Sequence, residues 1–376
     1  MQAYNGLVEK QSFTLPSYTT VGGREIKDLK VGWESYGQLN AARDNAILVP
    51  HYYSANSHVA GRYQADDAAP GYWDSIIGPG KPLDTDRYFV ISVDALVNMN
   101  SKDGITVTTG PASTNPATGK PYGLDFPVVT IRDFVRVQRA LLDSLGIVRL
   151  VAAAGVSMGA LQSYEWAAAY PEMVERVIAV NGTPTQKPYA ICNLESWISP
   201  IKADANWNNG NYYGGAEPLA GVTQAMFNVI VAALHADGIA AAFQYQWADA
   251  ARSPLDAISN NFLVNQAFQA NCALRAQTMV DANHMLYMTR ANQLFVAGTP
   301  GSSVDPELKN IQAKTLVVQY SSDTLFPVAD AAAQVARLKE NGTAAELVEI
   351  ASMGGHLAGV TEIDKASEAI RGHLAR

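Results

Sequence analysis

The stretch "RLVAAAGVSMGALQSYEWAAAY", residues Arg149–Tyr170, decides the fold of this chain. It opens with a short apolar run typical of a buried strand, passes through a glycine-rich turn and continues as a helical pattern that Pro171 ends. In the turn, Ser157 stands between Gly155 and Gly159, which is the Gly-x-Ser-x-Gly spacing of a nucleophile elbow. Glycines suit this turn because its backbone is strained and the helix packs closely against the strand. The stretch therefore predicts a strand, a sharp turn and a helix that together present a serine nucleophile.

An alternative role for Ser157 is that of an ordinary helix cap after a glycine turn. The strand before it and the helix after it favour the nucleophile. That setting lifts the serine oxygen above the sheet edge, beside the first backbone N–H groups of the helix, which can stabilise an oxyanion.

Strands and helices alternate on both sides of this stretch and predict a mainly parallel, doubly wound α/β sheet. The runs Ala46–Val49 and Tyr88–Asp94 are continuously apolar, as in strands covered on both faces. A helix capped by Thr130 is expected to end near Gly146. The pattern continues with a strand at Arg176–Val180, a strand in "AKTLVVQYSSD", a helix over Val328–Lys339, a strand in "AELVEI" and a final helix from about Glu362.

The composition of the sequence changes between about Gly182 and Gly301, where tryptophans and tyrosines lie among Ala- and Asn-rich stretches typical of helices and loops. No convincing strand is expected there. We interpret residues 183–300 as a helical cap inserted into an α/β core that comprises residues 1–182 and 301–376.

Composition and charge exclude several classes of function. Of the 376 residues, 48% are apolar and 16% charged, as in an ordinary soluble globular protein. The formal net charge is -8 and no basic segment stands out, so nucleic acid is not expected as a partner. Cys192 and Cys272 lack the spacing of a zinc site or a disulfide scaffold, and no metal or cofactor is expected. Without a leader pattern or an apolar run long enough to cross a membrane, the expected location is the cytoplasm.

A serine nucleophile needs a base, and the hydrolase order places an acid and then a histidine after the serine in the chain. Asp323 follows the strand "TLVVQY" and His356 follows the strand "LVEI", so both are expected at the sheet edge that carries Ser157. His356 would take the serine proton, while Asp323 would fix its tautomer and stabilise the imidazolium. Asp94 also ends a strand and remains the alternative acid, although it precedes the serine.

The other histidines are weaker candidates for the base. His235, His284 and His373 lie inside helical patterns, where packed or surface histidines are the usual case. His51 and His58 lie in the loop after the first apolar run, and we expect them to shape the pocket.

The oxyanion hole is predicted from position in the chain. One donor should come from the loop after the early strand, "PHYYSANSH", and the other from the residue after the nucleophile. The backbone N–H groups of Tyr53 and Met158 are therefore the predicted pair.

Several longer stretches resemble the homoserine O-acetyltransferase family of α/β-hydrolases, and the match runs over most of the chain. They are "HVAGRY" from His58, "TNPATGKPYGLDFPVVTIRDFVRVQ" from Thr114, "SMGALQSYEWAAAYPE" from Ser157, "DANHMLYMTRA" from Asp281 and "DTLFP" from Asp323. The resemblance implies an α/β-hydrolase fold, the triad Ser157, Asp323 and His356, an acyl-serine intermediate and commonly a homodimer built through the helical cap.

The sequence departs from the family where specificity is decided. The family's catalytic histidine is typically followed by an aspartate that helps to bind the amino group of homoserine, whereas Leu357 follows His356 here. The family's cap usually carries an arginine-bearing segment for the substrate carboxylate, but the matching stretch "GVTQAMFNVIVAAL" is apolar. The oxyanion loop "HYYSANSH" also replaces a family pattern nearer to His-Ala-Leu-Thr-Gly. An apolar pocket holds a zwitterion poorly, because each unpaired buried charge costs several kcal/mol.

These departures favour a serine carboxylesterase that hydrolyses small, uncharged esters, acetyl esters first, with water as the acyl acceptor. The alternative is a homoserine O-acetyltransferase that uses acetyl-CoA. An alternative of another class is a non-catalytic binding protein on a hydrolase fold.

Overall fold

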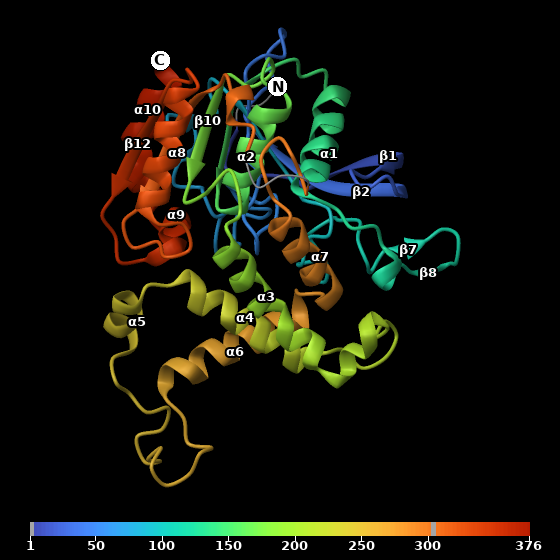
Figure 1. Ribbon diagram of the computed structural model, residues 1–376, viewed down its shortest axis with the longest axis vertical. Helices are drawn as coiled ribbons and strands as arrows, with labels where there is room; N and C mark the ends of the chain where they lie inside the picture. The colour runs from blue at the N-terminus through green and yellow to red at the C-terminus, as the bar shows by residue number, and fades with distance from the viewer. Residues whose placement is uncertain (1–3, 302–305) are drawn as a thin grey trace.

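The computed structural model describes residues 4–301 and 306–376 and shows an α/β core with a group of helices below one end of its sheet (Figure 1). The strands of the main sheet, in spatial order, are β1 (Gln11–Thr19), β2 (Glu25–Tyr36), β6 (Phe89–Val93), β3 (Ala46–Leu48), β9 (Leu150–Val156), β10 (Arg176–Val180), β11 (Lys314–Tyr320) and β12 (Ala345–Ile350). From β6 to β12 every neighbouring pair is parallel. The pairs β1–β2 and β2–β6 are antiparallel. The predicted mainly parallel α/β sheet is confirmed.

Both faces of this sheet are covered. The helices of the core are α1 (Ile131–Ser144), α2 (Met158–Ala169), α8 (Val328–Glu340), α9 (Ala358–Thr361) and α10 (Ser367–Ala375). In β6, Ile91 belongs to the same buried cluster as Phe134 of α1, whereas its neighbour Val90 belongs to a second cluster that includes Ile370 of α10. Neighbouring residues of a strand point to opposite faces, so a strand between two helix layers is apolar throughout. This explains the continuous apolar runs of the sequence.

Helix α1 begins where the sequence predicts. Thr130 forms a capping box, in which its side chain accepts from the Asp133 N–H and the Asp133 side chain accepts from the Thr130 N–H. Phe134 and Leu141 are buried on the face that meets the sheet. After the helix, Gly146 adopts a φ of 70°, a left-handed conformation that glycine adopts without a steric penalty.

The antiparallel strands β1 and β2 were not expected. Strand β1 lies at the edge of the sheet, most of its residues are exposed or half-buried, and it contains Pro16, which suits an edge strand only. It therefore lacks the apolar run that reveals the inner strands. The final helix also begins later than expected, at Ser367, because Ile363–Ala366 form a separate 3-10 turn.

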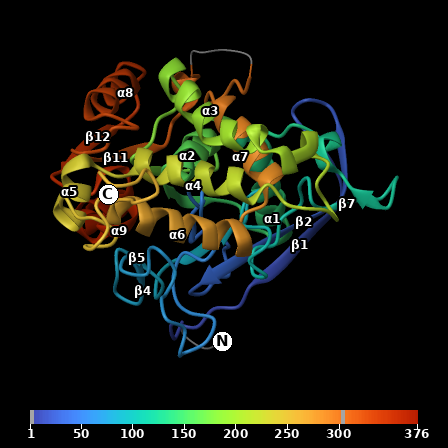
Figure 2. The ribbon, with the colours of Figure 1, turned by 90° about the horizontal axis from the view of Figure 1, so that it is seen from below.

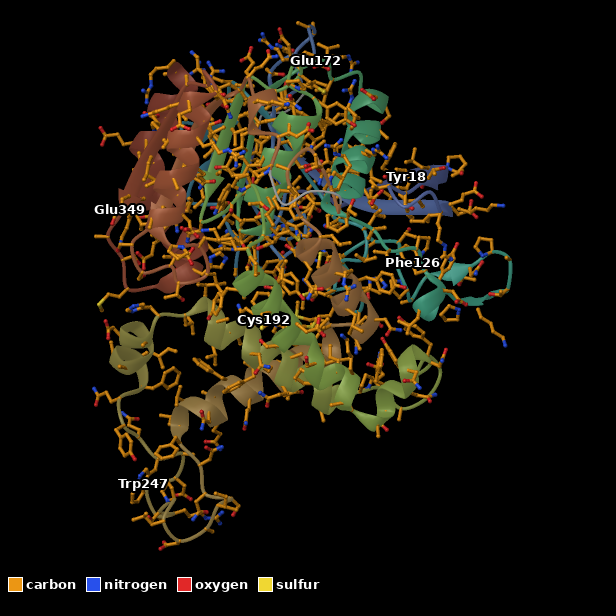
Figure 3. All side chains as sticks on the ribbon, in the orientation of Figure 1. Tyr18, Phe126, Glu172, Cys192, Trp247 and Glu349 are labelled. Carbon is orange, nitrogen blue, oxygen red and sulfur yellow. The ribbon has the colours of Figure 1, made fainter. Side chains whose placement is uncertain are left out.

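The group of helices below the sheet comes from the middle of the chain. It comprises α3 (Pro188–Ala203), α4 (Leu219–Ala233), α5 (Ala236–Phe243), α6 (Leu263–Thr278) and α7 (Ala282–Gln293). Seen from below, α3, α4 and α6 lie in front of the core (Figure 2). The loop of residues 244–262, which carries Trp247, projects farthest from the sheet (Figure 3).

Short strands form two small ribbons outside the main sheet, β4 (Ile77–Gly78) with β5 (Leu83–Asp84) and β7 (Thr114–Asn115) with β8 (Lys120–Pro121). In the described part of the chain, no single helix is long and apolar enough to cross a membrane. Helices α4 and α5 together reach that length and apolar content, but a bend of 106° separates them.

Candidate active site

Ser157 occupies a strained turn between β9 and α2. Its φ of 57° and ψ of -123° lie outside the regions that non-glycine residues normally adopt, as a nucleophile elbow requires. Glycines on both sides permit the turn: a Cβ at Gly155 would collide with the backbone of Gly159, and a Cβ at Gly159 would collide with the Pro50 carbonyl. The Ser157 N–H donates to the carbonyl of Val180 on the neighbouring strand over 3.0 Å. The sequence around the serine thus holds its side chain at the carboxyl end of the sheet.

Ser157, His356 and Asp323 form one hydrogen-bonded chain. Asp323 Oδ2 lies 2.8 Å from His356 Nδ1, and His356 Nε2 lies 2.8 Å from Ser157 Oγ. The carboxylate favours a proton on Nδ1, which leaves Nε2 free to accept the serine proton. Asp323 follows β11 and His356 follows β12, so the parallel strands bring all three residues to one edge. The structure therefore brings together the three predicted residues.

The carboxylate of Asp323 is held by its own loop as well as by His356. Its Oδ1 accepts from the N–H groups of Leu325, over 2.8 Å, and Phe326, over 3.1 Å. Gln319 Nε2 donates to Oδ2 over 3.3 Å. The Asp323 side chain is fully buried, and these donors stabilise its charge without water.

Asn181 fixes the loop that carries the histidine, and sequence reasoning missed it. It follows β10 with a φ of 45°, its Nδ2 donates to the His356 carbonyl over 3.0 Å, and its Oδ1 accepts from the Tyr320 N–H over 3.0 Å. One buried amide thus ties the histidine loop to the end of β11. The available signal was a polar residue directly after a buried strand, at the edge that carries the triad.

The two predicted oxyanion donors flank Ser157. Met158 is the first residue of α2, and Tyr53 lies in the loop after β3, where it lines both cavities next to the serine. Within residues 4–301 and 306–376, neither backbone N–H donates to a protein acceptor. Both N–H groups are thus available to an oxyanion. The Tyr53 side chain is fixed by a 2.6 Å hydrogen bond between its hydroxyl and Thr289 Oγ1 and by an edge-on contact with Trp197.

His51 and Asp94 brace this loop from behind and do not line the pocket. His51 Nδ1 donates to the Tyr52 carbonyl over 2.8 Å, and its Nε2 accepts from the Ala95 N–H over 3.0 Å. Burial lowers the pKa of His51, which favours the neutral ring that this pair of bonds needs. Asp94 accepts from the Ser57 N–H over 2.7 Å. His51 thus acts on the pocket only through the loop that it braces, and Asp94 is a structural acid without contact to His356 among the described residues.

The remaining histidines also lie away from the serine. His58 pairs with Glu34 over 3.0 Å, so the expectation that it shapes the pocket is wrong. His284 is buried in α7 and binds the Asn98 carbonyl. His235 caps α5, and His373 lies in α10.

Two cavities meet at Ser157. The larger, of about 510 Å³, lies against α4 and α6 and includes His356 and Leu357 in its wall. The smaller, of about 40 Å³, lies against α3 and includes Met158 but not His356. Ser157, Tyr53, Trp197 and Leu325 line both. The wall of the larger cavity also contains Arg275, which sequence reasoning missed.

The fold and this geometry define a serine hydrolase of the α/β-hydrolase class. A family model described as "alpha/beta hydrolase fold" matches residues 68–362. The homoserine O-acetyltransferase of Desulfotalea psychrophila is 39% identical, over 98% of this chain and 95% of that protein. A homoserine O-acetyltransferase of Symbiobacterium thermophilum is also 39% identical, over 94% of this chain and 90% of that protein.

Among solved structures with the same fold are an esterase and a homoserine O-acetyltransferase. The crystal structure of an esterase called E22 has a TM-score of 0.93 and 46% identity, covering 98% of this chain and 100% of that one. The homoserine O-acetyltransferase from Bacillus anthracis has a TM-score of 0.92 and 35% identity, covering 100% of this chain and 99% of that one. The chain belongs to the homoserine O-acetyltransferase family of α/β-hydrolases, whose members perform acyl transfer or ester hydrolysis through a serine.

Proposed function

We propose that this protein is a serine carboxylesterase that hydrolyses esters of small, uncharged acyl groups, acetyl esters first. The observation that carries the proposal is the hydrogen-bonded chain from Asp323 through His356 to Ser157, next to a very small cavity. Water is the proposed acyl acceptor.

The chemistry follows from these contacts. Ser157 Oγ attacks the ester carbonyl while His356 Nε2 takes its proton, and the N–H groups of Tyr53 and Met158 stabilise the oxyanion. The C–O bond to the alcohol breaks, the alcohol takes the proton from His356, and the acyl group remains on Ser157. A water molecule then loses its proton to His356 and attacks the acyl-serine. The bond to Ser157 Oγ breaks as His356 returns the proton to that oxygen, which releases the acid and restores the serine.

The two cavities support a short acyl group. The leaving alcohol takes its proton from His356, and only the larger cavity includes His356 in its wall. The acyl group then lies in the smaller cavity, beside Met158 at the oxyanion hole. That cavity measures about 40 Å³, against about 510 Å³ for the larger one. The smaller cavity therefore favours a short acyl group such as acetyl over longer chains.

The lining of the larger cavity supports water over homoserine as the acceptor. Met226 and Leu357 contribute apolar side chains, and no aspartate or glutamate occurs among the described residues that line it. The ammonium group of homoserine would lose its hydration there without gaining a carboxylate partner. The transferase remains the second candidate because sequence relatives bear that name.

Labelling with a fluorophosphonate tests the hydrolase chemistry. We expect one phosphonyl group on Ser157, located by peptide mass spectrometry, with loss of acetate release from phenyl acetate. Ser157→Ala should abolish both the label and the turnover while the protein stays folded. A native protein that neither takes the label nor releases acetate would be a non-catalytic binding protein.

We also propose a cytoplasmic homodimer that associates through the cap. Support for the dimer comes from large apolar side chains exposed on the projecting loop, among them Leu255 and Ile258. Two free cysteines support a reducing compartment. Sedimentation velocity tests the dimer: Ile258→Asp should shift the protein to monomer, and an unchanged dimer would exclude this surface.

A further inference from the structure

The larger cavity contains one permanently charged side chain. Arg275 lies on α6, one helical turn after Asn271, and both residues line the cavity. The described residues around them are mostly apolar and include Ile230, Leu234 and Val360. The cavity is therefore apolar along α4, as the sequence indicates, but not along α6.

The guanidinium of Arg275 is only partly hydrogen-bonded. It carries five N–H donors, and its one hydrogen bond to a described residue runs from Nη2 to the Ser54 carbonyl over 3.4 Å. That carbonyl already accepts from Asn100 Nδ2 over 3.0 Å. Arg275 Nε is buried without an acceptor, and no carboxylate in the described chain forms an ion pair with this arginine. The guanidinium thus has unused donors.

An unpaired guanidinium in an apolar wall is costly unless a ligand pairs with it. Burial lowers the pKa of Arg275, with Tyr52 and Cys272 opposing that change. The planar guanidinium matches the two oxygens of a carboxylate, and the apolar surroundings strengthen the attraction by excluding water. A carboxylate is therefore the ligand that this cavity lacks.

We propose that Arg275 binds a carboxylate on the alcohol portion of the ester. The inference rests on the proposed function, because the alcohol portion is assigned to the larger cavity by the proton that it takes from His356. It revises the expectation of an uncharged substrate: the acyl group is small and uncharged, and the alcohol carries the negative charge. The preferred substrates are then acetyl esters of hydroxy acids.

A different role for Arg275 is to brace the oxyanion loop. Ser54 follows Tyr53, so a contact with the Ser54 carbonyl can affect the oxyanion donor. The two roles differ in what they predict for neutral esters. A brace supports the hydrolysis of every ester equally, whereas a carboxylate-binding residue supports only esters that carry the charge.

The test uses acetyl esters of glycolate, β-hydroxypropionate and γ-hydroxybutyrate, each beside its uncharged primary amide. We measure kcat/KM from acetate release for the native protein, Arg275→Met, Arg275→Lys and the control Arg252→Met. Arg252 is an exposed cap arginine outside the larger cavity. For at least one of the three hydroxy acids, kcat/KM of the native protein should be about 10- to 100-fold higher for the carboxylate ester than for its amide. This is the range expected for a hydrogen bond to a charged group.

Arg275→Met should abolish this preference by raising KM for the carboxylate ester and should leave the amide ester unaffected. Arg275→Lys should retain part of the preference, and Arg252→Met should retain all of it. Equal kcat/KM values for native protein on every pair, or an equal loss for both esters in Arg275→Met, would overturn the inference. Failure of the proposed function gives a different result. The native protein would then release no acetate from the amide esters, or the Ser157→Ala variant would release acetate from them as well.

Discussion

The side chain of Asn181 donates a hydrogen bond to the backbone carbonyl of His356 over 3.0 Å. The same amide accepts from the N–H of Tyr320, so one residue joins the end of β11 to the loop of the base. This contact holds the imidazole within reach of Ser157, although Asn181 touches none of the reacting atoms. Asn181 is therefore a positioning residue.

Asn181→Asp separates the two halves of this contact. The carboxylate can still accept from Tyr320, but it cannot donate to the His356 carbonyl. We expect kcat to fall by about 10- to 100-fold with little change in KM, and the free energy of unfolding to fall by about 1–3 kcal/mol, since a buried acceptor loses its partner. Stopped assays and urea denaturation measure these effects. An unchanged kcat at reduced stability would show that Asn181 supports the fold alone.

The two candidate acids should respond differently to loss of charge. Asp323→Asn is expected to lower kcat by about four orders of magnitude, because the amide no longer fixes the tautomer of His356. Asp94→Asn should keep kcat within about tenfold of the native value and lower stability by about 1–3 kcal/mol, because Asp94 accepts from the Ser57 N–H and pairs with Lys10. Steady-state kinetics with phenyl acetate decide the ranking. The reverse order would make Asp94 the catalytic acid.

Glu34 makes stability depend on pH far from the active site. Burial opposes its ionisation, but hydrogen bonds from His58, Lys10 and Tyr63 and the Lys10 charge outweigh burial and lower its pKa from 4.5 to about 2. Because the folded-state pKa lies below the unfolded-state value, the contribution to stability is complete above pH 4.5 and disappears as the pH falls toward about 2.

Glu34→Gln should therefore destabilise the protein by about 3 kcal/mol at pH 7, and the difference should narrow between about pH 4.5 and pH 3. Urea denaturation of both proteins across this range measures it. A difference that is the same at pH 7 and pH 3 would mean that packing, and not the Glu34 charge, accounts for the loss.

The small cavity predicts the acyl chain length that the enzyme accepts. Leu194 and Trp197 of α3 line this cavity. The ratio of kcat/KM for 4-nitrophenyl acetate to that for the butyrate should be high in the native protein and should fall by about tenfold or more in Leu194→Ala, since one methylene in an apolar pocket changes selectivity about 10- to 200-fold. Leu274→Ala, at an exposed leucine of α6, is the control. A ratio that Leu194→Ala leaves unchanged would place the acyl group elsewhere.

The inner strands and the three triad residues could be predicted because each leaves a local pattern. A continuous apolar run followed directly by Ser157, Asp323 or His356 identifies both the strand and the sheet edge. Strand β1 leaves no such pattern, because it is exposed and pairs on one side.

Contacts between distant segments could not be predicted from local pattern. Arg275 meets Ser54 across 221 positions of the chain, and Asn181 meets His356 across 175. In the sequence, Arg275 is one basic residue in a helical stretch, and only the packing of α6 against the core places it at the cavity. The same holds for His51, whose burial behind its loop follows from β3 and the segment after β6.

The fate of the acyl-enzyme is the most direct test of the central claim that water accepts the acyl group from Ser157. The native protein is incubated with phenyl acetate or acetyl-CoA as the acetyl donor, and homoserine is added at increasing concentration. Mass spectrometry then quantifies the two products, acetate and O-acetylhomoserine. We predict acetate as the product, at a rate that homoserine does not change, and no product with Ser157→Ala. O-acetylhomoserine as the main product, with faster consumption of the acetyl donor, would contradict the esterase and identify the protein as a transferase.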